Sequence, residues 1–517
     1  MRNFLGRCKN TKIWHFLAEH KMPERCSDFV FNNKVTLVFL VITVLAFFSA
    51  NASLDWFFAE LFARFGRNTF MVLSLLIPVV AGLGLNFGIV IGAMAAQVAV
   101  FVLLLWGGVG FWGLMAAAAL ATPIAMGLGY TVGRLFNGMK GSEMIGGMIA
   151  GLFYDGFYQF FFLWVIGGLI PIANHRFTVG DAGVGVVNTI DLGASPNYFR
   201  QAIDDVPMLT ILEVAFFAAV AITVLLIIIR LVKKQPLKLG GPLKILIPLA
   251  IAFGLSFIQP VKVFLYQPRL LGLYAMRLVA VGFVLFVIYR VVVDKFYDKK
   301  PGWIFTTRYI PHLLGALAFF AITLPQDFNS GLRSAQISVL AYLLVGALCL
   351  AIKWFLNTRL GQNMRTVGHS RPVATAAGIN VDRTRIIAMM ISTVLAAYAQ
   401  IIAMQNFGIM NTYGGHTQVG LYAIAALLVG GATVSRASVK HALIGVVLFH
   451  ALFILAPAAG NQLLGSAQIG EYFRVVVSNA VIALALIMHA WKRVKKRKVE
   501  KQEADADSTA VSVAEPV

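Results

Sequence analysis

The chain has 517 residues, of which 59% are hydrophobic and 13% are charged, and its formal net charge is +21. Soluble domains are about half apolar and about a quarter charged, so this composition excludes a soluble globular protein. Many apolar runs reach the length of about 18 residues that crosses a bilayer as a helix. The lysines and arginines lie between those runs, where they orient the chain and meet anionic membrane lipids; this placement argues against nucleic acid as a partner.

The sequence predicts an all-α, polytopic helical membrane protein with about 10–14 transmembrane helices. The predicted spans are 35–50, 69–85, 88–106, 111–134, 147–171, 209–232, 243–259, 276–293, 309–325, 335–356, 386–407, 420–434, 439–457 and 474–491. The basic clusters between them fall on one side of the membrane, which the positive-inside bias assigns to the cytoplasm. Both termini are therefore expected to be cytoplasmic.

Three parts follow from this pattern: a basic N-terminal segment at 1–34, a transmembrane domain at 35–491 and an acidic tail at 492–517 that is expected to be disordered. The first apolar run begins near Val35 without a small-residue cleavage site, which predicts a retained helix rather than a signal peptide. Residues 172–208 form an external loop. Residues 52–65 repeat apolar side chains at helical spacing beside charged ones, as in a helix that lies in the outer interface.

Enzyme signatures are weak throughout. Gly108, Gly110 and Gly113 form a GxGxxG between two apolar helices without a preceding strand, so a helix-packing or turn role is favoured over dinucleotide binding. The chain has no phosphate-binding loop and no HExxH, and its three cysteines lack CxxC spacing. We therefore expect no catalytic residue, no metal site and no cofactor bound by this chain.

The run at 73–101 is interrupted near its middle by Gly82, Gly84, Asn86 and Gly88, and Gln97 follows. A break at membrane depth frees backbone groups that lipid cannot satisfy, so such breaks belong against protein or a water-filled cavity. Discontinuous helices of this kind often hold substrate sites. Close helix packing through small residues is the alternative.

Asp155 lies inside the apolar run 143–162, and Tyr158 and Gln159 share its helical face. A carboxylate there should face a cavity or a partner, because exposure to lipid costs several kcal/mol. Three interpretations stay open: a cavity lining, a structural hydrogen bond to another helix, and a proton relay, which would usually need more acidic partners.

The segment "RPVATAAGI" at 371–379 lies on the expected cytoplasmic side. Pro372 suits the first turn of a short helix, and Gly378 suits its end. The alanines offer a nearly side-chain-free surface that another helix or groove can approach closely. These residues predict a docking helix, and a tight cytoplasmic turn is the alternative.

Three stretches together resemble the permease subunits of bacterial ABC importers of the branched-chain amino acid, ribose and nucleoside type. "GHSRPVATAAGINVDRTR" resembles the family's cytoplasmic A-A-x-x-x-G-I segment, with Val373 in the first alanine place. "YAIAALLVGGATVSRASVKHALIGVVL" resembles its A-I-A-x-x-x-x-G-G signature, and "LNFGIVIGAMAAQ" resembles a first-half stretch. The resemblance covers 69–491. The sequence departs from the family at "GIVIG", which lacks the usual Asp and Ser, and at "TVSRAS", where Gly-Gly-x-Gly is usual; extra apolar helices lie between 209 and 325.

The resemblance implies a permease that couples to ATPase subunits through the cytoplasmic loop 358–385. The implied ATPase-coupling residues are Arg371, Pro372, Ala374, Ala376, Ala377, Gly378 and Arg383. A second contact is expected from 137–144. Polar residues in apolar spans give a hypothetical substrate path of Asn86, Gln97, Asp155, Tyr158, Gln159, Gln400 and Gln405.

The implied partners are cytoplasmic ATP-binding subunits, which carry the ATP and Mg, a second permease of the same or a homologous chain, an extracytoplasmic substrate-binding protein and membrane lipids. The expected location is the bacterial inner membrane, and the expected solute is a small polar one: a sugar, a nucleoside or a branched-chain amino acid. The alternative is a secondary transporter or channel that works on an ion gradient without an ATPase. The few intramembrane acidic residues and the docking-type loop argue against it.

Overall fold

The structure is a computed structural model, and it describes residues 34–139, 141–172, 177–179, 184–193, 199–232, 240–296, 309–321, 323–466, 468–476, 479–480 and 482–483. The predicted N-terminal segment, except for its last residue, and the predicted tail lie outside these residues. Helices dominate the described part of the chain, which confirms the helical, polytopic class.

The helices are α4 (Lys34–Ala50), α5 (Leu54–Ser74), α6 (Leu76–Val80), α7 (Ile89–Leu105), α8 (Gly110–Gly138), α9 (Glu143–Phe160), the π-type turn η1 (Phe161–Leu169), α10 (Met208–Val232), α11 (Gly240–Leu255), α12 (Gln259–Leu265), α13 (Gly272–Phe296), α14 (Ile310–Ala321), α15 (Gln326–Ser334), α16 (Val339–Phe355), α17 (Arg359–His369), α18 (Arg371–Ala376), α19 (Val381–Phe407), α20 (Gly415–Val429) and α21 (Val439–Leu464). Among the described residues, six helices are long and apolar enough to cross a membrane, or up to eight if each of two bent pairs is one span. Four shorter apolar helices account for part of the difference from the larger number expected.

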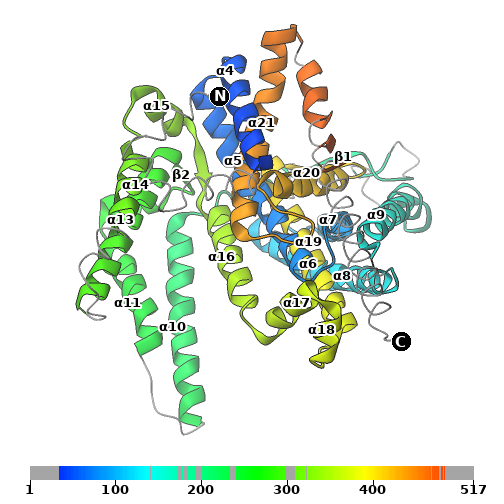
Figure 1. Cartoon of the computed structure of the whole chain (residues 1–517), viewed down its shortest axis with the longest axis horizontal. Helices are drawn as coiled ribbons and strands as arrows, with labels where there is room; N and C mark the ends of the chain where they lie inside the picture. The colour runs from blue at the N-terminus through cyan, green and yellow to red at the C-terminus, as the bar shows by residue number, and fades with distance from the viewer. Residues whose placement is uncertain are drawn as a thin grey trace, which may run out of the picture.

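The centre of the bundle is α19, which packs against α7, α8 and α5 (Figure 1). Small residues allow this close approach: a Cβ on Gly92 of α7 would lie 2.4 Å from the carbonyl oxygen of Thr393 on α19. A Cβ on Gly133 of α8 would lie 2.9 Å from the Cα of Ile386. The backbones of α7, α8 and α19 are therefore held together by van der Waals contact, as is usual where helices lack a hydrophobic driving force between them.

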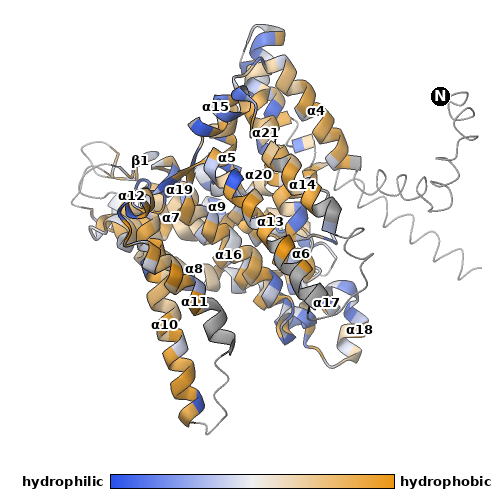
Figure 2. Cartoon of the chain, turned by 90° about the vertical axis from the view of Figure 1, so that its left-hand side faces the viewer, coloured by the Kyte–Doolittle hydropathy of each residue, from blue (hydrophilic) through white to orange (hydrophobic). Residues whose placement is uncertain are grey.

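The helices α10 to α15 form a group beside this bundle (Figure 1). In α10, Phe217 is 60% exposed and Leu225 is 56% exposed. Figure 2 shows α10 as almost entirely hydrophobic over its length. Such a surface is stable only against lipid or another protein, so this group extends the membrane-embedded part of the chain.

The predicted break is present. The helix α6 ends at Val80 and α7 begins at Ile89, and between them Gly82 (φ 73°) and Gly84 (φ 77°) adopt left-handed conformations that L side chains rarely take.

The expected interfacial helix at 52–65 is wrong as a separate element. Residues 54–65 are the first part of α5, which Ser53 caps and which continues unbroken to Ser74. The physical reason is that no helix breaker follows Phe65: Gly66 stays helical and packs against Tyr342 of α16.

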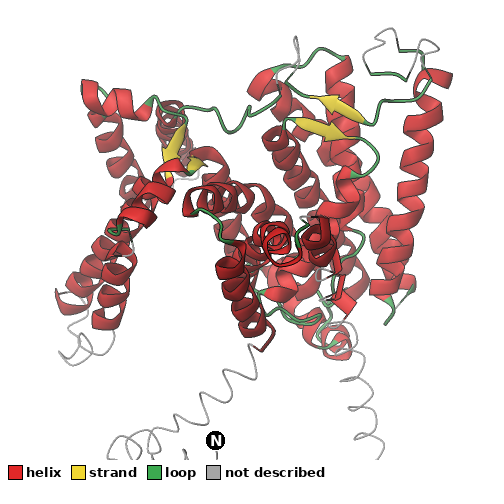
Figure 3. Cartoon of the chain, turned by 90° about the horizontal axis from the view of Figure 1, so that it is seen from above, coloured by secondary structure: helices red, strands yellow, loops and turns green. Residues whose placement is uncertain are grey.

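Two short antiparallel ribbons join loops on the expected outer side (Figure 3). β1 (Thr189–Asp191) pairs with β4 (Ile409–Asn411), with Ile190 opposite Met410. β2 (Arg269–Leu271) pairs with β3 (Gln336–Ser338). The first ribbon ties residues 189–191 of the long loop to the connection between α19 and α20.

Candidate functional site

The loop 358–385, which was predicted to couple to a partner, contains two short helices, α17 and α18. The bend between α16 and α17 is 76°, and α18 then turns the chain back towards α19. Pro372 lies in the first turn of α18, and Gly378 follows its end at φ 75°. Asn380 then caps α19 by accepting a hydrogen bond from the backbone N–H of Arg383 over 2.9 Å. The short helix is therefore formed by local capping residues, as the sequence predicts.

The segment 371–378, which we call the coupling segment, exposes most of its small residues. Val373 is 59% exposed, and Ala376, Ala377 and Gly378 are exposed. Ala374 differs from the expectation, because it is fully buried at 0% exposure and lies on the inner side of α18. The surface available to a partner is therefore made by the residues on either side of Ala374.

Glu143, at the start of α9, lies between two arginines. Its carboxylate forms ion pairs with Arg385 of α19 at 2.6 Å and with Arg371 of α18. Glu143 is 5% exposed and Arg385 is 0% exposed. Arg371, at the edge of the coupling segment, is therefore already paired with Glu143. Arg383, in contrast, is exposed. The pair of Glu143 and Arg371 links 137–144, the expected second cytoplasmic contact, directly to α18.

The break between α6 and α7 contacts α17. A Cβ on Gly368 would lie 2.1 Å from the carbonyl oxygen of Val80, and a Cβ on Gly82 would lie 2.7 Å from the Cα of Gly368. Two backbones touch here without side chains between them. The break between α6 and α7 is therefore in direct backbone contact with α17.

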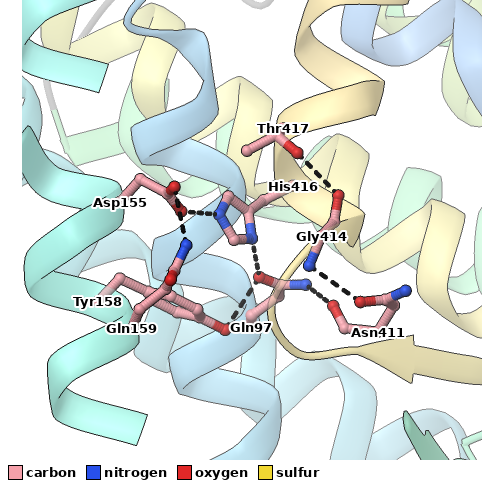
Figure 4. Close-up of polar contacts among 8 residues, drawn as sticks. All are labelled: Gln97, Asp155, Tyr158, Gln159, Asn411, Gly414, His416 and Thr417. Atoms are coloured by element: carbon pink, nitrogen blue, oxygen red, sulfur yellow. Dashed lines mark hydrogen bonds and ion pairs between the residues drawn. The ribbon is translucent and has the colours of Figure 1, made fainter. Parts of the chain in front are cut away.

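Four of the predicted path residues meet at His416, the second residue of α20 (Figure 4). Its Nε2 lies 2.6 Å from Asp155 Oδ1, and its Nδ1 lies 2.9 Å from Gln97 Oε1. Tyr158 donates to the same Gln97 oxygen over 3.0 Å, and Gln159 donates to Asp155 over 3.0 Å. This His416 network joins α7, α9 and α20.

The orientation of the Gln97 amide is set by a second contact. Gln97 donates through Nε2 to the carbonyl oxygen of Asn411 over 2.8 Å, so its Oε1 faces His416. This network therefore also ties α7 and α20 to Asn411, the last residue of β4.

The other three path residues lie elsewhere. Asn86, 1% exposed, donates to Ser392 of α19 over 3.4 Å and so ties the break to the central helix. Gln405 donates to Asp204 over 3.1 Å and lines a cavity of about 240 Å³, the Asp204 cavity. Gln400 lines a larger cavity of about 520 Å³, the Arg67 cavity. Arg67 belongs to the walls of both.

Sequence reasoning missed His416 and Glu143. His416 precedes the span expected at 420–434, whereas α20 begins at Gly415 and includes it. Glu143 had a signal: it is an acidic residue at the start of an apolar span, where a charge needs a partner. Among the described residues, no group of three or more His, Cys, Asp or Glu side chains is placed to hold a metal ion.

Comparison with known proteins identifies the class of chain. A family model described as "Branched-chain amino acid transport system / permease component" matches residues 214–488. The match supports the resemblance seen in the sequence over that range; for 69–213 the resemblance stays a prediction. No solved structure matches the chain.

Several curated permeases are similar over part of their length. "High-affinity branched-chain amino acid transport system permease protein LivH" of Salmonella typhimurium is 28% identical over 178 residues, 34% of this chain and 52% of the relative. "Probable ABC transporter permease protein YphD" of Escherichia coli is 29% identical over 181 residues, with the same coverage of each chain. "Ribose import permease protein RbsC" of Escherichia coli is 31% identical over 137 residues, 26% of this chain and 40% of the relative. The chain spans about half the length of the first of these relatives. It belongs to the family of branched-chain amino acid transport system permease components, a family of multi-pass membrane ABC permeases.

Proposed function

We propose that the chain is the membrane-spanning permease of an ABC importer for a small polar solute. It works with a second permease, two cytoplasmic ATP-binding subunits and an extracytoplasmic substrate-binding protein, in a bacterial inner membrane with both its termini cytoplasmic. ATP and Mg belong to the ATP-binding subunits. The observation that carries the proposal is the coupling segment: an exposed surface of small residues whose neighbouring helix touches the broken span directly.

The ATP-binding subunit contacts the exposed side of the coupling segment. Pro372, Val373, Ala376, Ala377 and Gly378 present little side-chain bulk there, so a groove can approach the backbone. The exposed Arg383 lies nearby and meets an acidic or polar group of the groove. Ala374 contributes from the inner side, by packing α18 against the rest of the chain.

Movement is transmitted by two rigid connections. In the first, Gly368 of α17 presses on Val80, where α6 ends and the break begins. In the second, Glu143 joins α18 to the start of α9 through Arg371. ATP binding that shifts the ATPase pair therefore biases the permease between inward-open and outward-open states, provided that the ATPase binds the two states with different affinity.

The solute path runs through the Asp204 cavity and the Arg67 cavity. Gln405 lines the first and Gln400 lines the second. Gln97, Asp155, Tyr158 and Gln159 act through the His416 network instead, and hold α7, α9 and α20 in one arrangement. Asn86 holds the break against α19. The substrate-binding protein docks on the outer loop 172–208, which the β1–β4 ribbon anchors over the α19–α20 connection.

Site-specific photo-crosslinking tests this proposal. A photoreactive phenylalanine analogue replaces Ala377, and cells that express the chain with the ATP-binding subunit encoded beside its gene are irradiated. We expect an adduct with the mass of the chain plus that subunit. The same analogue in place of Arg333, an exposed residue on the expected outer side, is the control and gives no such adduct. A chain that crosslinks to no ATP-binding subunit from position 377 yet transports solute in its absence would contradict the proposal.

A further inference from the structure

Basic side chains gather around a third cavity, which we call the basic cavity. It has a volume of about 630 Å³ and lies where the end of α16, the end of α17 and the start of α21 meet. Its basic lining residues are Lys353, Arg365, His369, Arg436 and Lys440. Among the described residues that line it there is no aspartate and no glutamate. Its described wall therefore carries positive charge alone.

The chain does not compensate these charges itself. No ion pair among the described residues joins Lys353, Arg365, Arg436 or Lys440 to a carboxylate, and all of these side chains are exposed. They come from α16, α17, the loop before α21 and α21 itself, so the fold brings them together across the sequence. A concave site lined by charges of one sign concentrates ions of the opposite sign. The basic cavity is therefore suited to an anion.

The remaining lining is mainly apolar, and it leads onto an exposed apolar face of α16. Leu350, in the cavity wall, is 70% exposed, and Trp354, one turn later, is 72% exposed. Leu343 is 50% exposed and precedes Leu350 at the i, i+7 spacing of one helical face. A tryptophan near the end of an apolar helix is typical of the level of the lipid headgroups. The basic cavity thus has a cationic end at that level and an apolar strip that continues along α16.

We propose that the basic cavity binds an anionic phospholipid of the leaflet on the expected cytoplasmic side. The lipid phosphate lies between Arg365 and Arg436, with the two lysines beside it, and an acyl chain follows Leu350 and Leu343. Both properties of the cavity select this occupant. A free phosphate ion gains nothing from the apolar strip, and a zwitterionic lipid brings a cation of its own into a positive site. The proposal requires only that the chain lies in a membrane, so it does not depend on the importer.

The position of the cavity gives the lipid a consequence. Val80 and Gly368 also line it, and these residues form the backbone contact between the α6–α7 break and α17. An anion among the basic side chains reduces their mutual repulsion and so favours the arrangement in which α16, α17 and α21 lie together. The bound lipid therefore stabilises the surroundings of this contact.

Native mass spectrometry of the purified full chain in detergent tests the site. The chain is titrated with phosphatidylglycerol, which is anionic, or with phosphatidylcholine of the same acyl chains, which has no net charge. We expect the phosphatidylglycerol adduct to form at the lower lipid concentration. The double substitution Arg365→Gln with Arg436→Gln should weaken the tightest phosphatidylglycerol binding by about tenfold or more, because each basic side chain near an anionic lipid adds to the attraction.

Two further double variants make the result decisive. Lys353→Gln with Lys440→Gln removes the other pair of charges and should also weaken binding, so the test stands if the arginine variant does not fold. Arg134→Gln with Arg359→Gln removes two exposed charges of the same expected side that do not line the cavity, and should bind as the unchanged chain does. Equal binding of the two lipids, or unchanged phosphatidylglycerol binding in the folded cavity variants, would overturn the inference.

Two competitors separate the lipid from other anionic occupants. Glycerol 3-phosphate carries the phosphate without the acyl chains, and at equal concentration it should not displace phosphatidylglycerol. Displacement would assign the cavity to a soluble phosphate compound and refute the lipid site. The second competitor is the ATP-binding subunit. If the cavity variants lose that subunit but keep their phosphatidylglycerol, the basic side chains belong to the subunit interface and the lipid site is refuted.

Discussion

Arg385 of α19 donates to the Glu143 carboxylate over 2.6 Å, although both side chains are almost completely buried. The same carboxylate also binds Arg371 of the coupling segment. One acidic residue thus connects the coupling segment, for which we propose contact with the ATP-binding subunit, with the central helix α19. Two further donor groups of Arg385, Nε and Nη1, have no hydrogen-bond partner among the described residues. Glu143 is therefore the main group that compensates the buried charge of Arg385.

Glu143→Ala should therefore destabilise the chain. Removing one member of a buried ion pair leaves the other charge uncompensated, which costs about 3–5 kcal/mol. The measurement is the free energy of unfolding of the detergent-solubilised chain in denaturant. Arg383→Gln, at an exposed charged residue of the helix that carries Arg385, is the control and should have a much smaller effect. Equal effects of the two substitutions would show that the Glu143 ion pairs contribute little.

Gly368→Ala should separate α17 from the break. The added methyl group would lie 2.1 Å from the Val80 carbonyl oxygen. Only a movement of the backbone can relieve this clash. Overpacking of this kind lowers the free energy of unfolding by about 1–3 kcal/mol. In the assembled complex we also expect a loss of solute-stimulated ATPase activity, measured on the folded fraction of the protein. Gly346→Ala on α16 is the matched control, because nothing lies within 4 Å of its added Cβ. A Gly368→Ala complex with normal stimulation would exclude this contact as a route of coupling.

Asp155→Asn and His416→Gln should not be additive. Each substitution alone disrupts the contact between His416 Nε2 and Asp155 Oδ1, so the second substitution has less left to disrupt. A double-mutant cycle on the free energy of unfolding should give a coupling energy of about 0.5–3 kcal/mol. The cycle of Asp155→Asn with Thr433→Val, a loop residue outside the network, supplies the baseline. Additivity in both cycles would mean that the pair contributes no specific stabilisation.

Tyr413 anchors the outer loop by donating to the Val186 carbonyl oxygen over 2.6 Å. Burial raises the pKa of its phenol above the ordinary value. Stability from this group is therefore complete below the unfolded pKa of about 10 and falls as the pH rises above it. Tyr413→Phe should cost about 1 kcal/mol at neutral pH and should flatten this alkaline fall. Amide hydrogen exchange at Ile190, followed from pH 7 to pH 11, measures both effects; an equally steep change in the variant would assign the fall to another group.

Local patterns predicted much of the fold. Gly82 and Gly84 marked the break because few residues other than glycine adopt a left-handed backbone, and Gly378 marked the end of α18 for the same reason. Pro372 marked the start of α18 because its fixed φ suits the first turn of a helix. The partners of Glu143 could not be found this way. They lie 228 and 242 residues away, and no local rule joins such positions.

The substrate path shows the same limit. Polar residues in apolar spans were interpreted as a substrate path, and that interpretation stays a prediction. In the structure Gln97 and Asp155 both contact His416, whereas Gln400 lines a cavity. A sequence predicts that a buried polar group has a hydrogen-bond partner. Which residue is the partner depends on how α7, α9 and α20 pack together. Arg67 was not singled out because it follows the helix expected at 52–65, whereas the structure places it inside α5 and on the walls of two cavities.

The most direct test of the account is co-purification of the chain from detergent with its ATP-binding subunit, compared with an Ala377→Asp variant. Aspartate adds bulk and an unpaired charge to the exposed side of the coupling segment. Asn357→Asp, at an exposed residue of the α16–α17 bend, adds a charge without bulk and is the control. The account predicts that the unchanged chain and the control retain the ATP-binding subunit and that the Ala377→Asp variant loses it. Retention by all three, or solute transport by a chain that binds no ATP-binding subunit, would contradict it.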